Sequence, residues 1–224
     1  MTPSTQAWVS LGILSLLTAV FVFLPAGTLR YWQGWVFLGV FLGGSLLTTV
    51  YVVKNDPALL RRRLRGGPLA EKGKTQKIIM LFTAIGFTAL LVVPGLDQRF
   101  GWSHVPPVQV MAGDVLIVLG FYIIFRVYKE NSYASATIEV ASDQRVISTG
   151  PYAVVRHPMY FGAILYLIGM PLALGSYRAI LADVFIAPFL LWRIFDEERF
   201  LTRNLPGYAQ YCAKVRWRLV PGVF

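Results

Sequence analysis

The chain has 224 residues, of which 56% are hydrophobic and only 14% are charged, and its formal net charge is +10 at pH 7. Soluble domains average about 45–50% apolar and about 25% charged residues, so this composition argues against an ordinary soluble domain. The positive charge falls in short stretches between long apolar runs, and we expect no nucleic-acid partner. The sequence therefore indicates one helical membrane domain.

The apolar runs are expected to form about six membrane-embedded helices. A helix needs about 20 mostly apolar residues to cross the hydrocarbon core of a bilayer. The longer runs span residues 8–24, 31–53, 78–96 and 108–125. The last contains one interruption, at Asp114. The first is expected to be a membrane helix rather than a signal peptide, because no basic residue precedes Trp8.

Local patterns mark the second predicted helix and the loop after it. Three aromatic residues are expected to anchor the start of this helix at the membrane interface: Tyr31, Trp32 and Trp35. Gly39 and Gly43 form a small-xxx-small pair that can permit close helix packing, although chance spacing explains it equally well. Residues 57–65 are expected to form a short surface helix.

Two shorter apolar runs complete the membrane domain. Residues 161–177 and 179–192 are divided by a few polar residues around Arg178, which is typical of a tight helical hairpin. The predicted fold class is therefore an all-α, polytopic membrane bundle whose last two segments form this hairpin. Residues 1–128 are expected to form the N-terminal membrane helices, and residues 129–224 a C-terminal region that carries the chemistry.

Positive charge is expected to lie on one side of the membrane. With six crossings, alternate loops share a side, and the stretches 54–77, 126–156 and 193–224 together hold 18 of the 21 Lys and Arg residues. The positive-inside rule then predicts that these stretches and both termini are cytoplasmic.

Anionic lipid head groups are the expected partner of the first basic loop. Four arginines cluster there, and such clusters beside membrane helices attract anionic lipids. They are Arg61, Arg62, Arg63 and Arg65. The single cysteine, Cys212, excludes a disulfide framework and a cysteine-based metal site, and no metal is expected.

Three polar clusters lie near the ends of the hairpin, at residues 150–162, 193–199 and 206–211. The hairpin brings the first two together, because both lie at its cytoplasmic mouth. Ionisable residues at the edge of a membrane segment are functional candidates. Ordinary structural roles are equally open from the residues alone, since Arg193 and Glu197 are four apart on a helix and can form an ion pair.

The order of these clusters resembles the isoprenylcysteine carboxyl methyltransferase family, whose wider group includes membrane phospholipid methyltransferases. The strings that carry the resemblance are GPYAVVRHPMYFG at 150–162, DEERFL at 196–201, LPGYAQY at 205–211 and VPGVF at the end. The resemblance covers about residues 129–224 and implies that this part is a methyltransferase region. The first 110 residues match only as apolar helices.

The resemblance implies that S-adenosylmethionine binds at the cytoplasmic mouth of the hairpin. The positions that match cofactor-binding residues of the family are Tyr152, His157, Pro158, Met159, Tyr160 and Glu197. A stretch that lines the cofactor through its backbone matches Gln144, Arg145, Val146 and Ile147. Thr137 is included in the site, although the family often has an amide side chain there.

Arg193 and Glu197 are the implied catalytic residues, with Arg193 also binding the methyl acceptor. A carboxylate acceptor is already ionised at pH 7, so it needs no general base. Catalysis is then the alignment of the carboxylate oxygen, the methyl carbon and the sulfur in a line. Arg193 is expected to hold the carboxylate by two parallel hydrogen bonds.

The leading expectation is methylation of the carboxylate of a prenylcysteine or a similar lipophilic acceptor, which enters from the bilayer. A lipid amine or a small thiol is the alternative acceptor, and its deprotonation would require Glu197 or His157. A non-enzymatic transporter or scaffold is the remote alternative. That alternative predicts ionisable residues in the middle of helices, of which Asp114 and Asp183 are the best cases.

Overall fold

The computed structural model describes residues 1–66, 70–71 and 73–224, and within them the chain is helical with no strand. The elements are α1 (Pro3–Ala26), α2 (Trp32–Asn55), α3 (Pro57–Leu64), α4 (Lys74–Phe100), α5 (Pro107–Glu130), the 3-10 turn η1 (Gly150–Ala153), α6 (Pro158–Ala173), α7 (Ile180–Asn204) and α8 (Tyr208–Lys214). The all-α prediction is confirmed. The short helix expected after α2 is also present as α3, whose start Asp56 caps by accepting a hydrogen bond from the Leu59 amide at 2.9 Å.

Four helices, α1, α2, α4 and α5, are long and apolar enough to cross a membrane. They have 24 to 27 residues, and a helix of 24 residues is about 36 Å long, which exceeds the hydrocarbon core. The shorter helix α6 is also apolar. Large apolar side chains on these helices remain exposed, as expected for a surface that faces lipid. The chain is therefore a polytopic membrane helical bundle.

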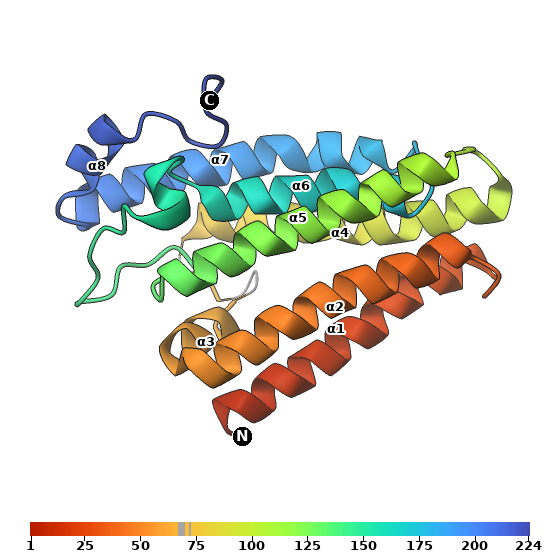
Figure 1. Ribbon diagram of the computed structural model, residues 1–224, viewed down its shortest axis with the longest axis horizontal. Helices are drawn as coiled ribbons and strands as arrows, with labels where there is room; N and C mark the ends of the chain where they lie inside the picture. The colour runs from red at the N-terminus through yellow and green to blue at the C-terminus, as the bar shows by residue number, and fades with distance from the viewer. Residues whose placement is uncertain (67–69, 72) are drawn as a thin grey trace.

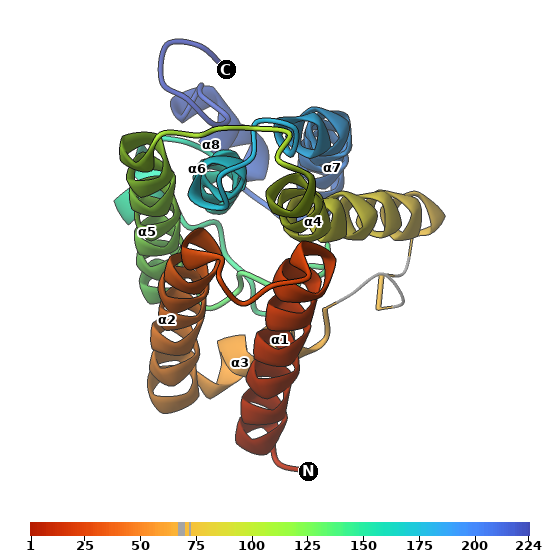
Figure 2. The same cartoon turned by 90° about the vertical axis from the view of Figure 1, so that its right-hand side faces the viewer.

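The long helices run roughly along the longest axis of the molecule (Figure 1). Three short connections, residues 27–31, 101–106 and 174–179, lie together at one end. The opposite end carries the N-terminus, α3, η1, α8 and the segment between α5 and α6, and we call it the polar end. The described parts of the three basic stretches therefore lie toward this end of the bundle. Seen along the bundle, α6 lies between α5 on one side and α4 and α7 on the other (Figure 2).

Glycines allow the backbones of α5 and α6 to approach each other closely. A Cβ atom added to Gly120 would lie 2.5 Å from the carbonyl oxygen of Gly162, and one added to Gly113 would lie 2.7 Å from that of Gly169. Both are closer than real Cβ contacts allow, so the two backbones touch at both levels. This contact fixes the start of α6, which belongs to the polar end.

The small-residue pair predicted on α2 does not serve this purpose. A Cβ atom at Gly39 or Gly43 would have no neighbour within 4 Å among the described residues. Small-xxx-small spacing on one helix does not predict whether a second helix packs against that face. On α5 and α6 the glycines are seven residues apart, so the shorter pattern overlooks them.

Replacing Gly120 by alanine should lower the stability of the bundle. The added methyl group would force α5 away from α6, and such overpacking costs about 1–3 kcal/mol even though alanine favours a helix. We expect a lower apparent Tm in detergent micelles. Gly39→Ala, which adds the same methyl group in open space, should keep or raise the Tm. Equal Tm values for Gly120→Ala and the unaltered protein would contradict the close contact.

Two expectations about helix ends are wrong. Tyr31 is fully buried rather than interfacial, and its hydroxyl donates to the carbonyl oxygen of Leu174 at 2.5 Å. Trp35 remains exposed, as expected. Helix α4 continues through Pro94 to Phe100, whereas the sequence pattern predicts that the connection to the next helix begins at Pro94. Neighbouring membrane helices tolerate an internal proline when they pack around it, and Pro94 is buried here.

Candidate functional site

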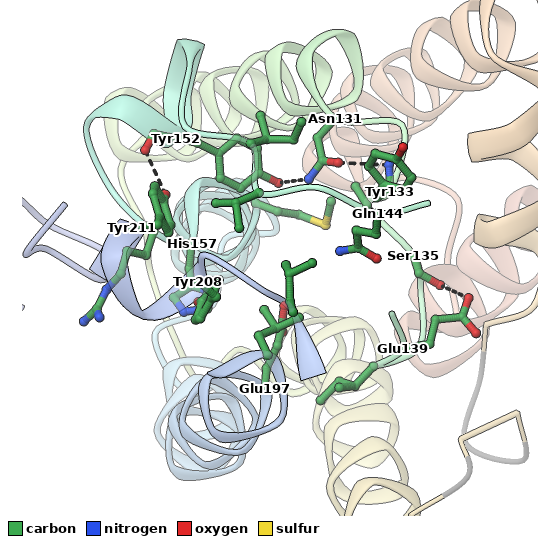
Figure 3. A pocket seen from close by; sticks show the side chains of 18 of the residues that line it. Asn131, Tyr133, Ser135, Glu139, Gln144, Tyr152, His157, Glu197, Tyr208 and Tyr211 are labelled. Atoms are coloured by element: carbon green, nitrogen blue, oxygen red, sulfur yellow. Dashed lines mark hydrogen bonds between the residues drawn. The ribbon is translucent and has the colours of Figure 1, made fainter. Parts of the chain in front are cut away.

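A pocket at the polar end contains about 890 Å³ of empty space, part of it open to the surroundings. The segment between α5 and α6, together with α6, α7 and α8, forms its walls (Figure 3). All twelve site residues predicted from the sequence line it: Thr137, Gln144, Arg145, Val146, Ile147, Tyr152, His157, Pro158, Met159, Tyr160, Arg193 and Glu197. The structure therefore brings the predicted residues together, while their individual roles stay predictions.

The hairpin positions the centre of this pocket. Pro158 begins α6, because a proline needs no amide partner in the first helical turn. Tyr160 follows in the same turn and donates its hydroxyl to Glu197 on α7, with 2.5 Å between Tyr160 Oη and Glu197 Oε2. One helical turn before Glu197, Arg193 Nε donates to the same Tyr160 hydroxyl at 3.2 Å. The phenol thus links the two residues expected to carry the chemistry.

Arg193 takes its ion-pair partner from a distant part of the chain. Among the described residues it pairs with Glu71, with 2.8 Å between Nη2 and Oε1, and not with Glu197. Its Nη1 donates to Gln76 Oε1 at 2.6 Å, and its Nη2 also donates to the carbonyl oxygen of Ala136 at 3.1 Å. Glu71 is only 3% exposed. The simple i, i+4 ion pair with Glu197 is therefore excluded for this conformation.

His157 lines the pocket but interacts with Glu198 rather than Glu197. Its Nε2 lies 3.1 Å from Glu198 Oε1, and the residue is only 4% exposed. The same carboxylate lies 3.2 Å from Arg156 Nε and accepts a hydrogen bond from Arg218 Nε at 2.9 Å. The His157 ring also packs edge-to-face on Tyr160. The buried cluster of Arg156, His157, Glu198 and Arg218 therefore supports the pocket wall that contains His157 and Tyr160.

The C-terminal tail is bound to the start of α6. The amides of Arg156 and His157 donate to the carbonyl oxygens of Trp217 and Arg218, each at 2.9 Å. These bonds hold the tail behind the buried cluster around Glu198. The LPGYAQY string lines the pocket through Leu205, Tyr208 and Tyr211, and the segment after it bonds to the start of α6.

Three tyrosines form one wall of the pocket (Figure 3). Tyr208 and Tyr211 lie on α8, and the Tyr211 hydroxyl donates to the carbonyl oxygen of Tyr152 at 2.8 Å. Asn131 Nδ2 donates to the Tyr152 hydroxyl at 2.9 Å. Burial raises the pKa of Tyr152, so its side chain remains a neutral phenol at physiological pH.

The opposite wall contains residues that the sequence analysis did not single out. Tyr133, Ser135 and Glu139 line the pocket from the segment after α5. Ser135 Oγ donates to Glu139 Oε1 at 3.1 Å, so the Glu139 carboxylate is turned toward Ser135, away from Glu197 (Figure 3). This segment forms neither a helix nor a strand. Without a periodic pattern, no sequence signal distinguishes these residues from an ordinary loop.

Two of the four clustered arginines contact the pocket wall. Arg62 Nη1 donates to the carbonyl oxygen of Ser132 at 2.7 Å. Arg63 Nη1 donates to the carbonyl oxygen of Ser135 at 3.3 Å and lies 3.7 Å from the sulfur of Met159. Arg61 and Arg65 are exposed. Of the four arginines expected to bind anionic lipid, Arg62 and Arg63 therefore bond to the protein, while Arg61 and Arg65 are exposed.

A second cavity lies between α1, α2, α5 and α6, with about 1150 Å³ of empty space including its open part. Apolar side chains such as Leu14, Phe41 and Phe121 line most of it. Arg63 also belongs to its lining. Because Arg63 contacts Met159 of the first pocket, the two spaces adjoin at this residue.

Comparison with known proteins shows which sequences the C-terminal half of this chain resembles. Residues 108–206 match the sequence model of the Phospholipid methyltransferase family. A probable protein-S-isoprenylcysteine O-methyltransferase of Oryza sativa subsp. indica is 27% identical over 134 residues, which cover 57% of this chain and 66% of the relative. The protein-S-isoprenylcysteine O-methyltransferase of Schizosaccharomyces pombe is 33% identical over 75 residues, 33% of this chain and 32% of the relative.

A reductase is also similar to this chain. The Delta(14)-sterol reductase TM7SF2 of Mus musculus is 25% identical over 224 residues, which cover 85% of this chain and 52% of the relative. The chain thus spans about half the length of this reductase and 66% of the rice protein. The family match falls on the segment that carries α5, the pocket and the hairpin. Residues 108–206 of this chain are therefore similar to the Phospholipid methyltransferase family, and parts of the chain are similar to protein-S-isoprenylcysteine O-methyltransferases.

Proposed function

We propose that the chain is an S-adenosylmethionine-dependent methyltransferase that methylates a lipophilic acceptor at the polar end of the bundle. The observation that carries this proposal is the hydrogen bond from Tyr160 to Glu197 inside the pocket. It joins the two family strings of the hairpin at one point, within the segment that matches the family. Neither string alone forms a pocket.

The chemistry of the pocket fits this cofactor. S-adenosylmethionine has a sulfonium cation, an amino-acid end and a nucleoside, and when bound it supplies an electrophilic methyl group. The carboxylates of Glu197 and Glu139 can accept hydrogen bonds from ammonium or ribose hydroxyl groups. The rings of Tyr152, Tyr208 and Tyr211 offer faces to a cation or a base.

The acceptor is proposed to be the carboxylate of a prenylcysteine or a similar lipophilic acid. The names of the rice and fission-yeast relatives support this choice. The second cavity adjoins the pocket at Arg63 and offers an apolar place for the chain of such an acceptor. Arg193 would then orient the carboxylate, after exchange of one of its present partners. A lipid amine is the second candidate, since the matching family model describes phospholipid methyltransferases.

The polar end is proposed to face the cytoplasm, where the cofactor is available. The support is the charge distribution, because the basic stretches lie together at this end. The exposed Arg61 and Arg65 are proposed to contact anionic lipid head groups there.

Methyl-labelled S-adenosylmethionine tests the proposed function directly. The purified protein in lipid nanodiscs would be incubated with N-acetyl-S-farnesylcysteine, phosphatidylethanolamine or a small thiol. We expect label in the farnesylcysteine as a base-labile methyl ester. Label in the amine or thiol instead would retain the enzyme class and change the acceptor. The absence of both label and affinity for S-adenosylhomocysteine would contradict the proposal and favour a different activity, such as that of a reductase or a scaffold.

A further inference from the structure

Glu71 is an acidic residue in an otherwise basic loop. Between Asp56 and Asp97 the sequence contains no other Asp or Glu. Its side chain is almost completely buried against Arg193, and its second oxygen, Oε2, lies 3.4 Å from the Ile138 amide. A single buried carboxylate in such a loop indicates a specific task, because burying a charge is costly unless it is paired.

The hydrogen bonds of Arg193 leave little room for an acceptor. A guanidinium has five N–H groups. Arg193 makes four hydrogen bonds to Tyr160, Gln76, Glu71 and Ala136 within the described part of the chain. A carboxylate bound by two parallel hydrogen bonds needs two N–H groups on one edge. An anionic acceptor can therefore bind Arg193 in this way only by replacing a protein partner.

Glu71 is the partner that an acceptor carboxylate would replace. Gln76 is also bonded to Asp196, and the Tyr160 hydroxyl is also bonded to Glu197, so both are held by a second side chain. Within residues 1–66, 70–71 and 73–224, the Glu71 side chain has one polar contact besides Arg193, a long one with the Ile138 amide. Exchange of Glu71 for a substrate carboxylate also preserves the charge balance of the buried guanidinium.

We propose that Glu71 is a specificity-determining residue that competes with the anionic group of the acceptor for Arg193. This inference rests on the proposed function and names a residue outside the family's matched segment. The competition weakens binding of a carboxylate acceptor and leaves an uncharged analogue unaffected. Glu71 thus sets how strongly the site distinguishes an acid from its neutral counterpart.

The test compares a carboxylate with its neutral match. N-acetyl-S-farnesylcysteine and its carboxamide would be titrated against three proteins in nanodiscs: the unaltered chain, Glu71→Gln and Glu71→Asp. In Glu71→Gln the carboxylate should bind about tenfold more tightly, as expected for one charged hydrogen bond, while the carboxamide should be unchanged. Glu71→Asp keeps the competing charge and should retain the original preference. Equal ratios of acid to amide affinity in all three proteins would overturn the proposal.

Two further measurements separate this inference from the proposed function and from misfolding. S-adenosylhomocysteine should bind all three proteins equally, and its failure to bind the unaltered chain would refute the proposed function instead. If Glu71→Gln does not fold, the unaltered chain still decides the question. Competition by Glu71 predicts that the unaltered chain binds the carboxylate less than about tenfold more tightly than the carboxamide. A preference of about a hundredfold or more would show an unopposed Arg193 and overturn the proposal.

Discussion

Replacing Glu197 by alanine should reduce the affinity for S-adenosylhomocysteine by about 100-fold, because a charged hydrogen-bond acceptor is removed from the centre of the pocket. Glu197 has one oxygen bonded to the Tyr160 hydroxyl, and it lines the pocket together with the 144–147 stretch. Its loss also leaves that hydroxyl without its acceptor. Isothermal titration calorimetry on the detergent-solubilised protein measures the change.

Two variants show whether the effect belongs to this carboxylate. Asp143→Ala removes an exposed carboxylate from the segment between α5 and α6. Asp143 does not line the pocket, so the affinity for S-adenosylhomocysteine should not change. Tyr160→Phe removes one neutral donor and should cost about fivefold in affinity, less than the loss of Glu197 itself. Unaltered affinity in Glu197→Ala would contradict the assignment of the pocket to the cofactor.

The sequence predicts the parts of this fold that depend on local pattern. Uncharged runs longer than about 17 residues locate α1, α2 and α4, because a membrane core excludes charge along the whole helix. The hairpin follows from the polar residues around Arg178. The convergence of Tyr160 and Glu197 follows in turn, since the two ends of an antiparallel hairpin must meet. The family resemblance adds which of these residues belong to the pocket.

Contacts between distant segments are the part that the sequence does not predict. Glu71 reaches Arg193 across 122 residues, and no periodicity connects their positions. The sequence offers one signal, a lone acidic residue in a basic loop, but its partner is visible only in the structure. The same holds for Gly120 and Gly162, whose contact depends on how α6 folds back along α5. Burial of Tyr31 likewise depends on a neighbour from the α6–α7 connection.

Replacing Glu198 by alanine should destabilise the protein by about 3–5 kcal/mol, the range observed when one partner of a buried ion pair is removed. The carboxylate is 8% exposed and faces Arg156, His157 and Arg218. Arg156 and His157 are themselves buried, so their side chains would remain without a counter-charge. Thermal unfolding in detergent micelles and limited proteolysis of the C-terminal tail measure the loss.

The adjacent pair Glu197 and Glu198 therefore separates binding from folding. Glu198→Ala should lower the Tm and expose the tail to protease, because Arg218 loses the bond that holds it near His157. Glu197→Ala should keep a Tm close to that of the unaltered protein, since Glu197 makes one hydrogen bond, to Tyr160, within the described residues. Arg199→Ala, an exposed change one residue further along α7, serves as the control for both. A Glu198→Ala protein with an unchanged Tm that no longer binds S-adenosylhomocysteine would contradict this structural role. It would indicate that Glu198 contributes to cofactor binding instead.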